Sequence, residues 1–177
     1  MKEAIGGVFS LEFIIVFLLL LNGYLAWNVN YTKAFRVKNE IRSIIQKNEG
    51  LTEDAMDDIQ NYTDKVNYTA DSRFADWCNK KGYYTCTTPN SKAVFCMEVA
   101  TNSKYGTDAD GNNIAAYYTV YTHVDFNIPV LNRFLPELTT GLFTVTGETS
   151  LIYTKETPFS NEKTSTDPAL RISQYCK

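Results

Sequence analysis

The chain begins with one long apolar run. From Val8 to Trp27 the side chains are almost all hydrophobic, and the strongly polar exceptions are Glu12 and Asn22. At a rise of about 1.5 Å per residue, about 20 helical residues span about 30 Å, which is the thickness of the hydrocarbon core of a bilayer. The pattern therefore predicts a membrane-spanning helix.

The apolar pattern continues beyond this run with a helical period. Ala34, Val37, Ile41 and Ile44 recur at spacings of three, four and three residues, while charged side chains occupy other positions of the turn. No proline interrupts the stretch before Gly50, a residue that is typical of a helix end. We expect one helix of roughly 40 residues, whose second half lays its apolar stripe on a sheet.

A second, shorter helix is predicted directly after this glycine. Thr52 is suited to cap it, and Glu53 and Asp54 lie in its first turn, where the helix dipole favours negative charge. Two further carboxylates, Asp57 and Asp58, raise the question of a cation site. Capping and solubility explain these side chains more simply, so we expect no metal here.

From Tyr83 onward the hydrophobic period changes to two, which is typical of strands with one buried face. Three stretches show it, and the residues that share a face in each are Ala93, Phe95, Met97 and Val99, then Tyr118, Val120, Thr122, Val124, Phe126 and Ile128, then Phe143, Val145, Leu151 and Tyr153 as one further strand. His123 lies on the polar face of the second stretch. Turn signals at Pro89–Asn90 and Asp110–Gly111 indicate an antiparallel sheet.

Two segments carry no strand pattern. Pro129 to Gly141 is expected to cross over between strands with a short helix, and Lys155 to Lys177, rich in Thr, Ser, Glu and Pro, is expected to be an irregular covering segment. The whole pattern predicts an α+β fold, in which a long N-terminal transmembrane and amphipathic helix packs on an antiparallel β-sheet.

The composition fits one compact domain after the membrane segment. The 177 residues are 44% hydrophobic and 14% aromatic, and the formal net charge is −3. A mildly acidic chain excludes nucleic acid as the main partner, because phosphate binding needs clustered lysine and arginine. The densest basic group, Lys33, Arg36, Lys38 and Arg42, is predicted to be a solvated helix face next to the membrane.

The four cysteines, Cys78, Cys86, Cys96 and Cys176, are predicted to form two disulfides. Their spacing matches neither zinc knuckles nor CxxC redox motifs, and an even number after a membrane segment is typical of an oxidising compartment. Three pairings are possible and the sequence does not select among them; reduced, buried cysteines are the alternative. A bridge to Cys176 would fasten the C-terminal segment.

Two signals disagree about the side of the membrane on which the domain lies. More basic residues follow the apolar run than precede it, which alone favours a cytoplasmic domain. The cysteines favour the outside, and we expect a single-pass cell-membrane protein with an extracytoplasmic C-terminal domain. A removed secretory signal peptide fits poorly, because the apolar run is long and Tyr24 is too bulky for the outer position of a cleavage site ending at Ala26.

A short motif opens the apolar run: Gly7 is followed five positions later by Glu12 and then by Phe13. This pattern resembles the processing site of type IV pilin-like proteins, and the phenylalanine is similar to the version in the tight-adherence (Tad) pilus system. The resemblance implies that a prepilin peptidase cuts between Gly7 and Val8. It also implies that Glu12 faces the new α-amino group of the same or a neighbouring subunit, which offsets the burial of both charges in lipid.

The segment from Tyr117 to Tyr153 extends the resemblance, since a strand, a proline-bearing crossover and a strand look like the C-terminal part of TadE-like minor pilins. The resemblance implies a leader at 1–7, a transmembrane and amphipathic helix at 8–49 and an extracytoplasmic α+β domain at 50–177. The implied function is that of a structural minor pilin or pseudopilin, present at the cell surface or in a pilus that serves adherence or secretion. The implied partners are the prepilin peptidase, other pilin subunits and membrane lipid, with no cofactor, metal or catalytic residue.

Two other functions stay open. The chain is alternatively an uncleaved bitopic membrane protein, whose disulfide-stabilised domain binds a ligand or glycan through some of its 12 tyrosines. A membrane-tethered hydrolase would use His123 with Asp125 and a serine that the sequence does not locate. The sequence contains no GxSxG, Walker A or GxGxxG motif that would favour a specific enzyme class.

Overall fold

The computed structural model describes residues 2–70, 72–90, 94–101, 115–124 and 143–153, together with Ile172 and Cys176. Two compact units divide the chain: Met1–Thr32 with Phe126–Gly141, and Lys33–Asp125 with Leu142–Lys177. In the described residues, the first unit is the apolar part of a helix, and the second contains the sheet and the helices that cover it.

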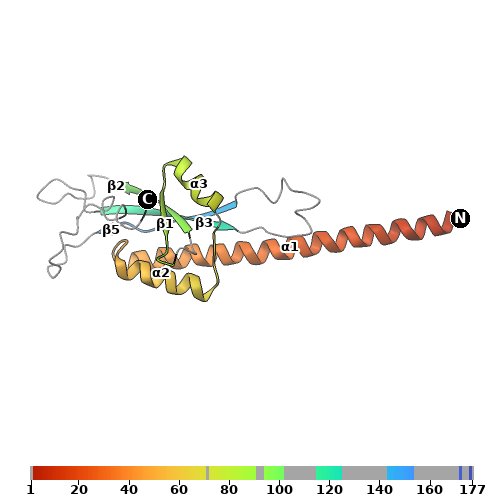
Figure 1. The fold of residues 1–177 in the computed structure, drawn as a ribbon, viewed down its shortest axis with the longest axis horizontal. Helices are drawn as coiled ribbons and strands as arrows, with labels where there is room; N and C mark the ends of the chain where they lie inside the picture. The colour runs from red at the N-terminus through yellow and green to blue at the C-terminus, as the bar shows by residue number, and fades with distance from the viewer. Residues whose placement is uncertain are drawn as a thin grey trace, which may run out of the picture. The chain divides into compact units, whose positions relative to one another are not determined.

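Helix α1 (Lys2–Lys47) runs without a break through the predicted membrane segment (Figure 1). Its apolar side chains are exposed in the first unit, where Phe9 is 69% and Phe13 is 74% exposed. Among the described residues, α1 is the one helix that is long and apolar enough to cross a membrane, as predicted. It begins before the expected Val8, because residues 2–7 contain no proline that would break it.

The C-terminal end of α1 is close to the predicted position. The backbone N–H of Gly50 donates a hydrogen bond to the carbonyl oxygen of Ile45 at 2.9 Å, which satisfies one of the helix's last acceptors. Gly50 has a φ of 134°, a conformation that side chains with a Cβ rarely adopt. The chain can therefore turn here into the next helix.

The second half of α1 is the amphipathic helix that the sequence predicts. All four residues of the predicted stripe are buried: Ala34, Val37, Ile41 and Ile44. Two side-chain hydrogen bonds fasten this half to the sheet: Thr122 Oγ1 donates to the carbonyl oxygen of Ala34 at 3.0 Å, and Gln46 Nε2 donates to Ser150 Oγ at 2.7 Å. Both contacts are within the second unit.

Helix α2 (Glu53–Lys65) begins as predicted at Thr52. The side-chain oxygen of Thr52 accepts a hydrogen bond from the backbone N–H of Ala55 at 3.1 Å, which is the N-cap geometry. One side of α2, including Met56 and Ile59, is buried in the core. The helix therefore lies in the same layer as the second half of α1.

The sheet is antiparallel, as predicted. Its strands are β1 (Tyr84–Thr87), β2 (Val94–Thr101), β3 (Ala115–Val124), β4 (Phe143–Glu148) and β5 (Ile152–Tyr153). The order is β1-β2-β3-β4, and β5 pairs with the beginning of β3 on the same side as β4. The predicted turn at Pro89–Asn90 joins β1 to β2.

The prediction of one strand from Phe143 to Tyr153 is wrong, because two short strands occupy this stretch. The interruption has a side-chain cause: the backbone N–H of Tyr118 donates to Thr149 Oγ1 at 3.0 Å, where a regular ladder would offer a carbonyl oxygen. The N–H of Thr149 donates to the carbonyl oxygen of Tyr118 at 2.9 Å. These two bonds interrupt the regular ladder at Thr149, and Leu151 lies outside both strands.

Some predictions lie outside the described residues. They are the strand positions Ala93, Phe126 and Ile128, the turn at Asp110–Gly111, the crossover from Pro129 to Gly141, and the irregular segment from Lys155 to Lys177 apart from Ile172 and Cys176.

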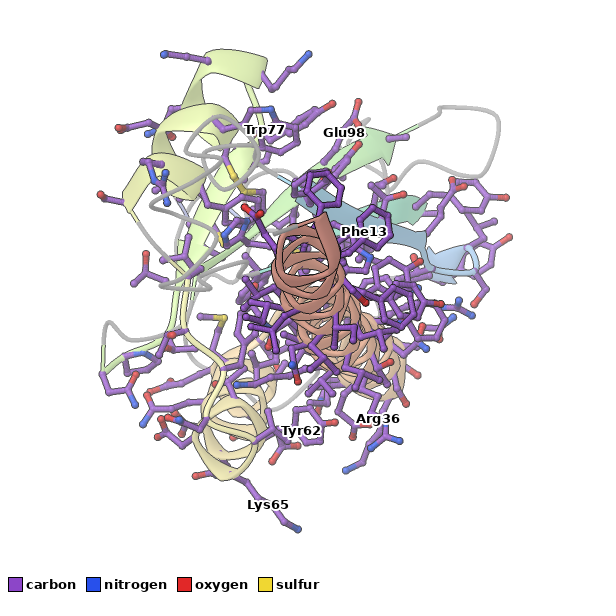
Figure 2. The ribbon with its side chains drawn as sticks, turned by 90° about the vertical axis from the view of Figure 1, so that its right-hand side faces the viewer. Phe13, Arg36, Tyr62, Lys65, Trp77 and Glu98 are labelled. Atoms are coloured by element: carbon purple, nitrogen blue, oxygen red, sulfur yellow. A yellow bond between two sulfur atoms is a disulfide. The ribbon has the colours of Figure 1, made fainter. Side chains whose placement is uncertain are left out.

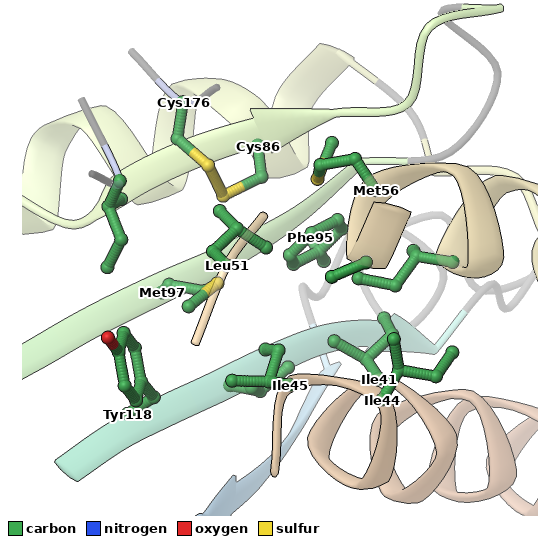
Figure 3. Packing of buried hydrophobic residues seen from close by; sticks show 14 of the residues in the cluster. Ile41, Ile44, Ile45, Leu51, Met56, Cys86, Phe95, Met97, Tyr118 and Cys176 are labelled. Carbon is green, nitrogen blue, oxygen red and sulfur yellow. A yellow bond between two sulfur atoms is a disulfide. The ribbon is translucent and has the colours of Figure 1, made fainter. Parts of the chain in front are cut away.

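The main core lies between the helices and one face of the sheet (Figure 3). Helix α1 contributes Ile41 and Ile45, and the turn between α1 and α2 contributes Leu51; all three are almost completely buried. The sheet contributes inward-facing side chains at two-residue spacing. The latter are Phe95 and Met97 on β2 and Tyr118 and Val120 on β3. The segment with a helical period and the segments with a period of two thus form the two layers that enclose one core.

A third helix, α3 (Ser72–Lys81), is absent from the sequence prediction and covers the other face of the sheet (Figure 1). A second, smaller core lies beneath it, formed by Phe74, Cys78 and Cys96. The sheet is therefore buried on both faces over part of its area, where the sequence predicts a polar outer face.

Candidate functional site

The N-terminal motif lies inside helix α1. Gly7 and Val8 have helical backbone, and Glu12 and Phe13 follow with exposed side chains. In the sequence, Glu12 is the single charged residue between Phe9 and Thr32. Because the surrounding side chains are apolar, lipid around this segment would surround the carboxylate, which then needs a compensating partner.

Two amides in the apolar segment are satisfied within the helix itself. Asn22 Nδ2 donates to the carbonyl oxygen of Leu18 at 2.8 Å, and Asn28 Nδ2 donates to that of Tyr24 at 3.0 Å. Each bond reaches back one helical turn and satisfies one amide N–H of the side chain within the helix. This lowers the cost of the amides in lipid, whereas the Glu12 carboxylate carries a full charge and needs a counter-charge there.

The helical conformation of Gly7 and Val8 bears on the expected cleavage. Proteases bind the substrate backbone in an extended form, so a peptidase must first unwind the beginning of α1 around this bond. Glycine weakens a helix by about 1 kcal/mol relative to alanine, and it lets another backbone approach closely. Gly6 and Gly7 together make this the part of α1 with the weakest helix propensity before Glu12.

The structure selects one of the three possible cysteine pairings. Cys78 on α3 is bonded to Cys96 on β2, and Cys86 on β1 is bonded to Cys176. Cys176 also forms a β-bridge with Cys86, and both residues are buried in the main core (Figure 3). Together with Ile172, which is fully buried, this bridge fastens the C-terminal segment to the edge of the sheet.

His123 does not lie on a polar surface, as the sequence suggests, but beneath α3. Its side chain is buried, and its ring stacks on Phe74 with centroids 5.5 Å apart. Its backbone N–H donates to Tyr68 Oη at 2.9 Å. These contacts give His123 a packing role beneath α3. Asp125, the neighbour considered with it, is outside the described residues.

An aromatic cluster that sequence reasoning missed lies where α3 meets the sheet. Tyr83 and Tyr121 stack with centroids 4.5 Å apart, and Trp77 meets both rings at steep angles. Trp77 also stacks on Phe74. The sequence does contain a signal for the helix that carries this cluster, because Phe74, Trp77 and Cys78 have the spacing of one helix face.

The hydroxyl of Tyr121 holds a surface carboxylate. Tyr121 Oη donates to Glu98 Oε2 at 3.0 Å, and Glu98 is exposed on β2. Burial is the main cause that raises the pKa of Tyr121, followed by hydrogen bonds to Tyr83 and Glu98. Tyr121 therefore stays a neutral donor at physiological pH, and Glu98 has a defined position at the edge of the aromatic cluster (Figure 2).

The basic group on α1 is not the solvated face that the sequence predicts. Lys33 donates to the carbonyl oxygen of Asn67, Arg36 is exposed, and Lys38 is only 5% exposed. Burial lowers the pKa of Lys38, and the charge of Arg42 lowers it further. The prediction fails at Lys38 because its side chain lies on the sheet side of α1, a position that spacing alone leaves open.

Within the described residues, no group of three or more His, Cys, Asp or Glu side chains is arranged to hold a metal ion. The carboxylates at the start of α2 have a structural role, since Glu53 and Asp54 lie in its first turn.

Comparison with models of known protein families, with curated proteins and with solved structures found no match to this chain.

Proposed function

We propose that this chain is a structural minor pilin or pseudopilin of the TadE-like kind, processed after Gly7 and assembled into a Tad or type IV-like pilus that serves adherence or secretion. The observation that carries the proposal is α1 itself. One continuous helix has an exposed apolar part with a single carboxylate and an amphipathic part that packs on an antiparallel sheet. The protein then acts by assembly and catalyses nothing.

The chemistry of Glu12 supports this proposal. A carboxylate near the end of a membrane helix costs somewhat less than the roughly 2.5–3.5 kcal/mol of a mid-helix position, and it persists where it has a partner. Cleavage before Val8 would create an α-amino group about one helical turn from Glu12. An ion pair between that amine and a carboxylate offsets the desolvation of both groups and selects one register between helices.

The extracytoplasmic location is part of the same proposal. Two disulfides cross-link the domain that follows the apolar helix, and disulfides persist in oxidising compartments. The prepilin peptidase, other pilin subunits and membrane lipid are the proposed partners.

The N-terminus of the mature protein tests this function directly. Protein isolated from its native membrane is expected to begin at Val8, and a Gly7→Leu variant is expected to keep Met1, because a branched side chain obstructs close approach of the peptidase to the backbone. Intact mass and N-terminal sequencing measure both. Gly6→Leu is the matched control, with the same substitution one residue away and normal processing. A native chain that still begins at Met1 would refute the pilin function.

A second candidate function has one observation in its favour. An uncleaved bitopic protein with a glycan-binding domain would use half-buried aromatic rings beside a positioned carboxylate, and the cluster of Trp77, Tyr83 and Tyr121 beside Glu98 offers both. Aromatic rings pack on the C–H faces of sugars, and carboxylates accept hydrogen bonds from sugar hydroxyls.

Glycan binding by the full-length chain in detergent tests this second candidate. If it is correct, Glu98→Gln is expected to lower the affinity for a bound glycan by about tenfold, because a charge-assisted hydrogen bond is lost. Glu148→Gln, at an exposed position on β4, is the matched control. Absence of binding on a glycan array, or equal binding by both variants, would exclude a role for the aromatic cluster in glycan recognition.

A further inference from the structure

One flank of α1, on the side of β4, is basic. Phe35, Lys38 and Arg42 follow one another at spacings of three and four residues and so share a side of the helix. The ammonium nitrogen of Lys38 lies 4.2 Å from the centroid of the Phe35 ring, which is itself 42% exposed, so the charge sits at the margin of the surface. We call these three residues the basic flank.

Gly147 on β4 makes room for this arrangement. A Cβ at this position would lie 2.5 Å from Cδ of Lys38 and 3.0 Å from its Nζ, closer than packed atoms approach. Glycine therefore allows the lysine stem to cross directly over the strand. The side chain of Lys38 is 5% exposed, and its ammonium group lies between Gly147 of β4, the edge strand of the sheet among the described residues, and the Phe35 ring.

The basic flank has an electrostatic imbalance. Lys38 and Arg42 are like charges one helical turn apart, which repel each other. Among the described residues, no carboxylate forms an ion pair with either of them; the ion pair that is present joins Lys47 to Asp58 at 3.9 Å. Burying an ammonium without a counter-charge is costly. The flank is therefore suited to an anionic partner that comes from outside the described chain.

A complementary flank lies on α2. Glu53 and Asp57 are both exposed and are also one helical turn apart. Asp64 continues their side of the helix and accepts two hydrogen bonds of 2.8 Å from Asn90, which follows β1. This side of α2 therefore faces away from α1, toward the β1 end of the sheet. We call Glu53 and Asp57 the acidic flank.

The two flanks lie on opposite sides of one layer. Figure 2, viewed nearly along α1, shows α2 on one side of this helix and β4 on the other. The side-chain contacts agree, because Lys38 lies against β4 and Asp64 accepts a hydrogen bond from Asn90, which follows β1. Surfaces on opposite sides cannot meet within one chain. They can meet between two chains in a head-to-tail contact, in which each copy uses both surfaces.

We propose that the acidic flank of one copy docks on the basic flank of a second copy of this chain, so that Glu53 and Asp57 supply the counter-charges for Lys38 and Arg42. The inference deepens the proposed function and rests on it in one respect, since that function brings copies side by side in one assembly. Both pairs of charges have the same separation of one turn, and the exposed ring of Phe35 adds apolar area at the contact.

A head-to-tail contact leaves a free acidic flank at one end and a free basic flank at the other, so it repeats. The chain would then line a ring or filament of its own copies rather than cap an assembly of other subunits. This consequence identifies the partner class as a second copy of the chain.

Charge reversal in the full-length chain tests the contact. Two differently tagged copies are expressed together in the native membrane, solubilised in a mild detergent, and captured through one tag. Arg42→Glu alone and Asp57→Lys alone are each expected to lower capture of the second copy by about tenfold or more, because each places like charges in contact. The chain that carries both substitutions is expected to recover capture, since the reversed charges again attract.

Asp76→Lys, an equal change of charge at an exposed position on α3, is the matched control and is expected to leave capture unchanged. Near-ultraviolet circular dichroism checks that each variant is folded. Unchanged capture in both single variants, or failure of the double variant to recover while folded, would overturn the proposal. A loss in Arg42→Glu with no loss in Asp57→Lys would also overturn it, and would instead indicate that anionic lipid headgroups occupy the basic flank.

The experiment distinguishes a failure of this contact from a failure of the proposed function. Loss and recovery of capture in a chain that still begins at Met1 would establish the contact between copies and remove the pilin function. Normal cleavage before Val8, together with unchanged capture of the second copy in all the charge-reversal variants, would leave the pilin function intact and refute this contact.

Discussion

Removal of the Cys86–Cys176 disulfide is expected to lower the free energy of unfolding by about 4–5 kcal/mol. The bond joins residues 90 positions apart, and a longer closed loop restricts the unfolded chain more strongly. It also holds Cys176 in the main core. Chemical unfolding of the full chain in detergent, followed by near-ultraviolet circular dichroism, compares the native protein with the Cys86→Ala, Cys176→Ala double variant.

The second disulfide supplies the matched comparison. Cys78 and Cys96 are 18 positions apart, so the Cys78→Ala, Cys96→Ala double variant is expected to lose only about 3 kcal/mol. This pair belongs to the smaller core beneath α3, so its loss should leave the main core intact. An equal or greater loss than in the Cys86, Cys176 variant would contradict the loop-length explanation.

The parts of the fold that the sequence predicts well are those with a strong local period. The stripe of Val37 and Ile41 on α1 and the alternation through Phe95 and Met97 on β2 depend on neighbours in the chain. A helix or strand with one buried face must place apolar residues at its own period, so the pattern is readable without knowledge of the partner. The N-cap at Thr52 is local in the same sense.

The failures have non-local causes. The break between β4 and β5 depends on a hydrogen bond from Tyr118 to Thr149, residues 31 positions apart. The burial of His123 depends on α3, which the pattern of Phe74, Trp77 and Cys78 indicates only when a helix is sought there. Alternation within one strand does not say whether another element covers its second face.

The candidate site shows the same difference between features that depend on local sequence and features that depend on distant parts of the chain. Gly7, Glu12 and Phe13 form a motif at fixed spacing, so the sequence alone is enough to propose it, and their role stays a prediction. The basic flank was recognised as a group of charges, but the burial of Lys38 was not, because it depends on a glycine at position 147 of a distant strand. The pairing of the cysteines likewise required the positions of α3, β1, β2 and Cys176.

Replacement of Glu12 by alanine is expected to reduce assembly by about tenfold or more while leaving the protein in the membrane. The substitution removes a carboxylate from an apolar helix, so insertion becomes more favourable, by less than the roughly 2.5–3.5 kcal/mol of a mid-helix site. It also removes the counter-charge of the amine at Val8. Assembly is measured as the amount of sheared surface filament that contains this chain, and insertion as the fraction that resists carbonate extraction.

The opposite directions of these two effects make the result specific to the carboxylate. A general defect in the helix would lower insertion and assembly together, whereas loss of an ion pair raises one and lowers the other. Ser10→Ala is the matched control, because it removes an exposed polar group from the same part of α1 and is expected to change neither quantity. The N-terminus of the Glu12→Ala protein should still be Val8, since the cleaved bond precedes the substitution. Assembly at the native level in that variant would remove the role assigned to Glu12 and leave its place in an apolar helix without a function.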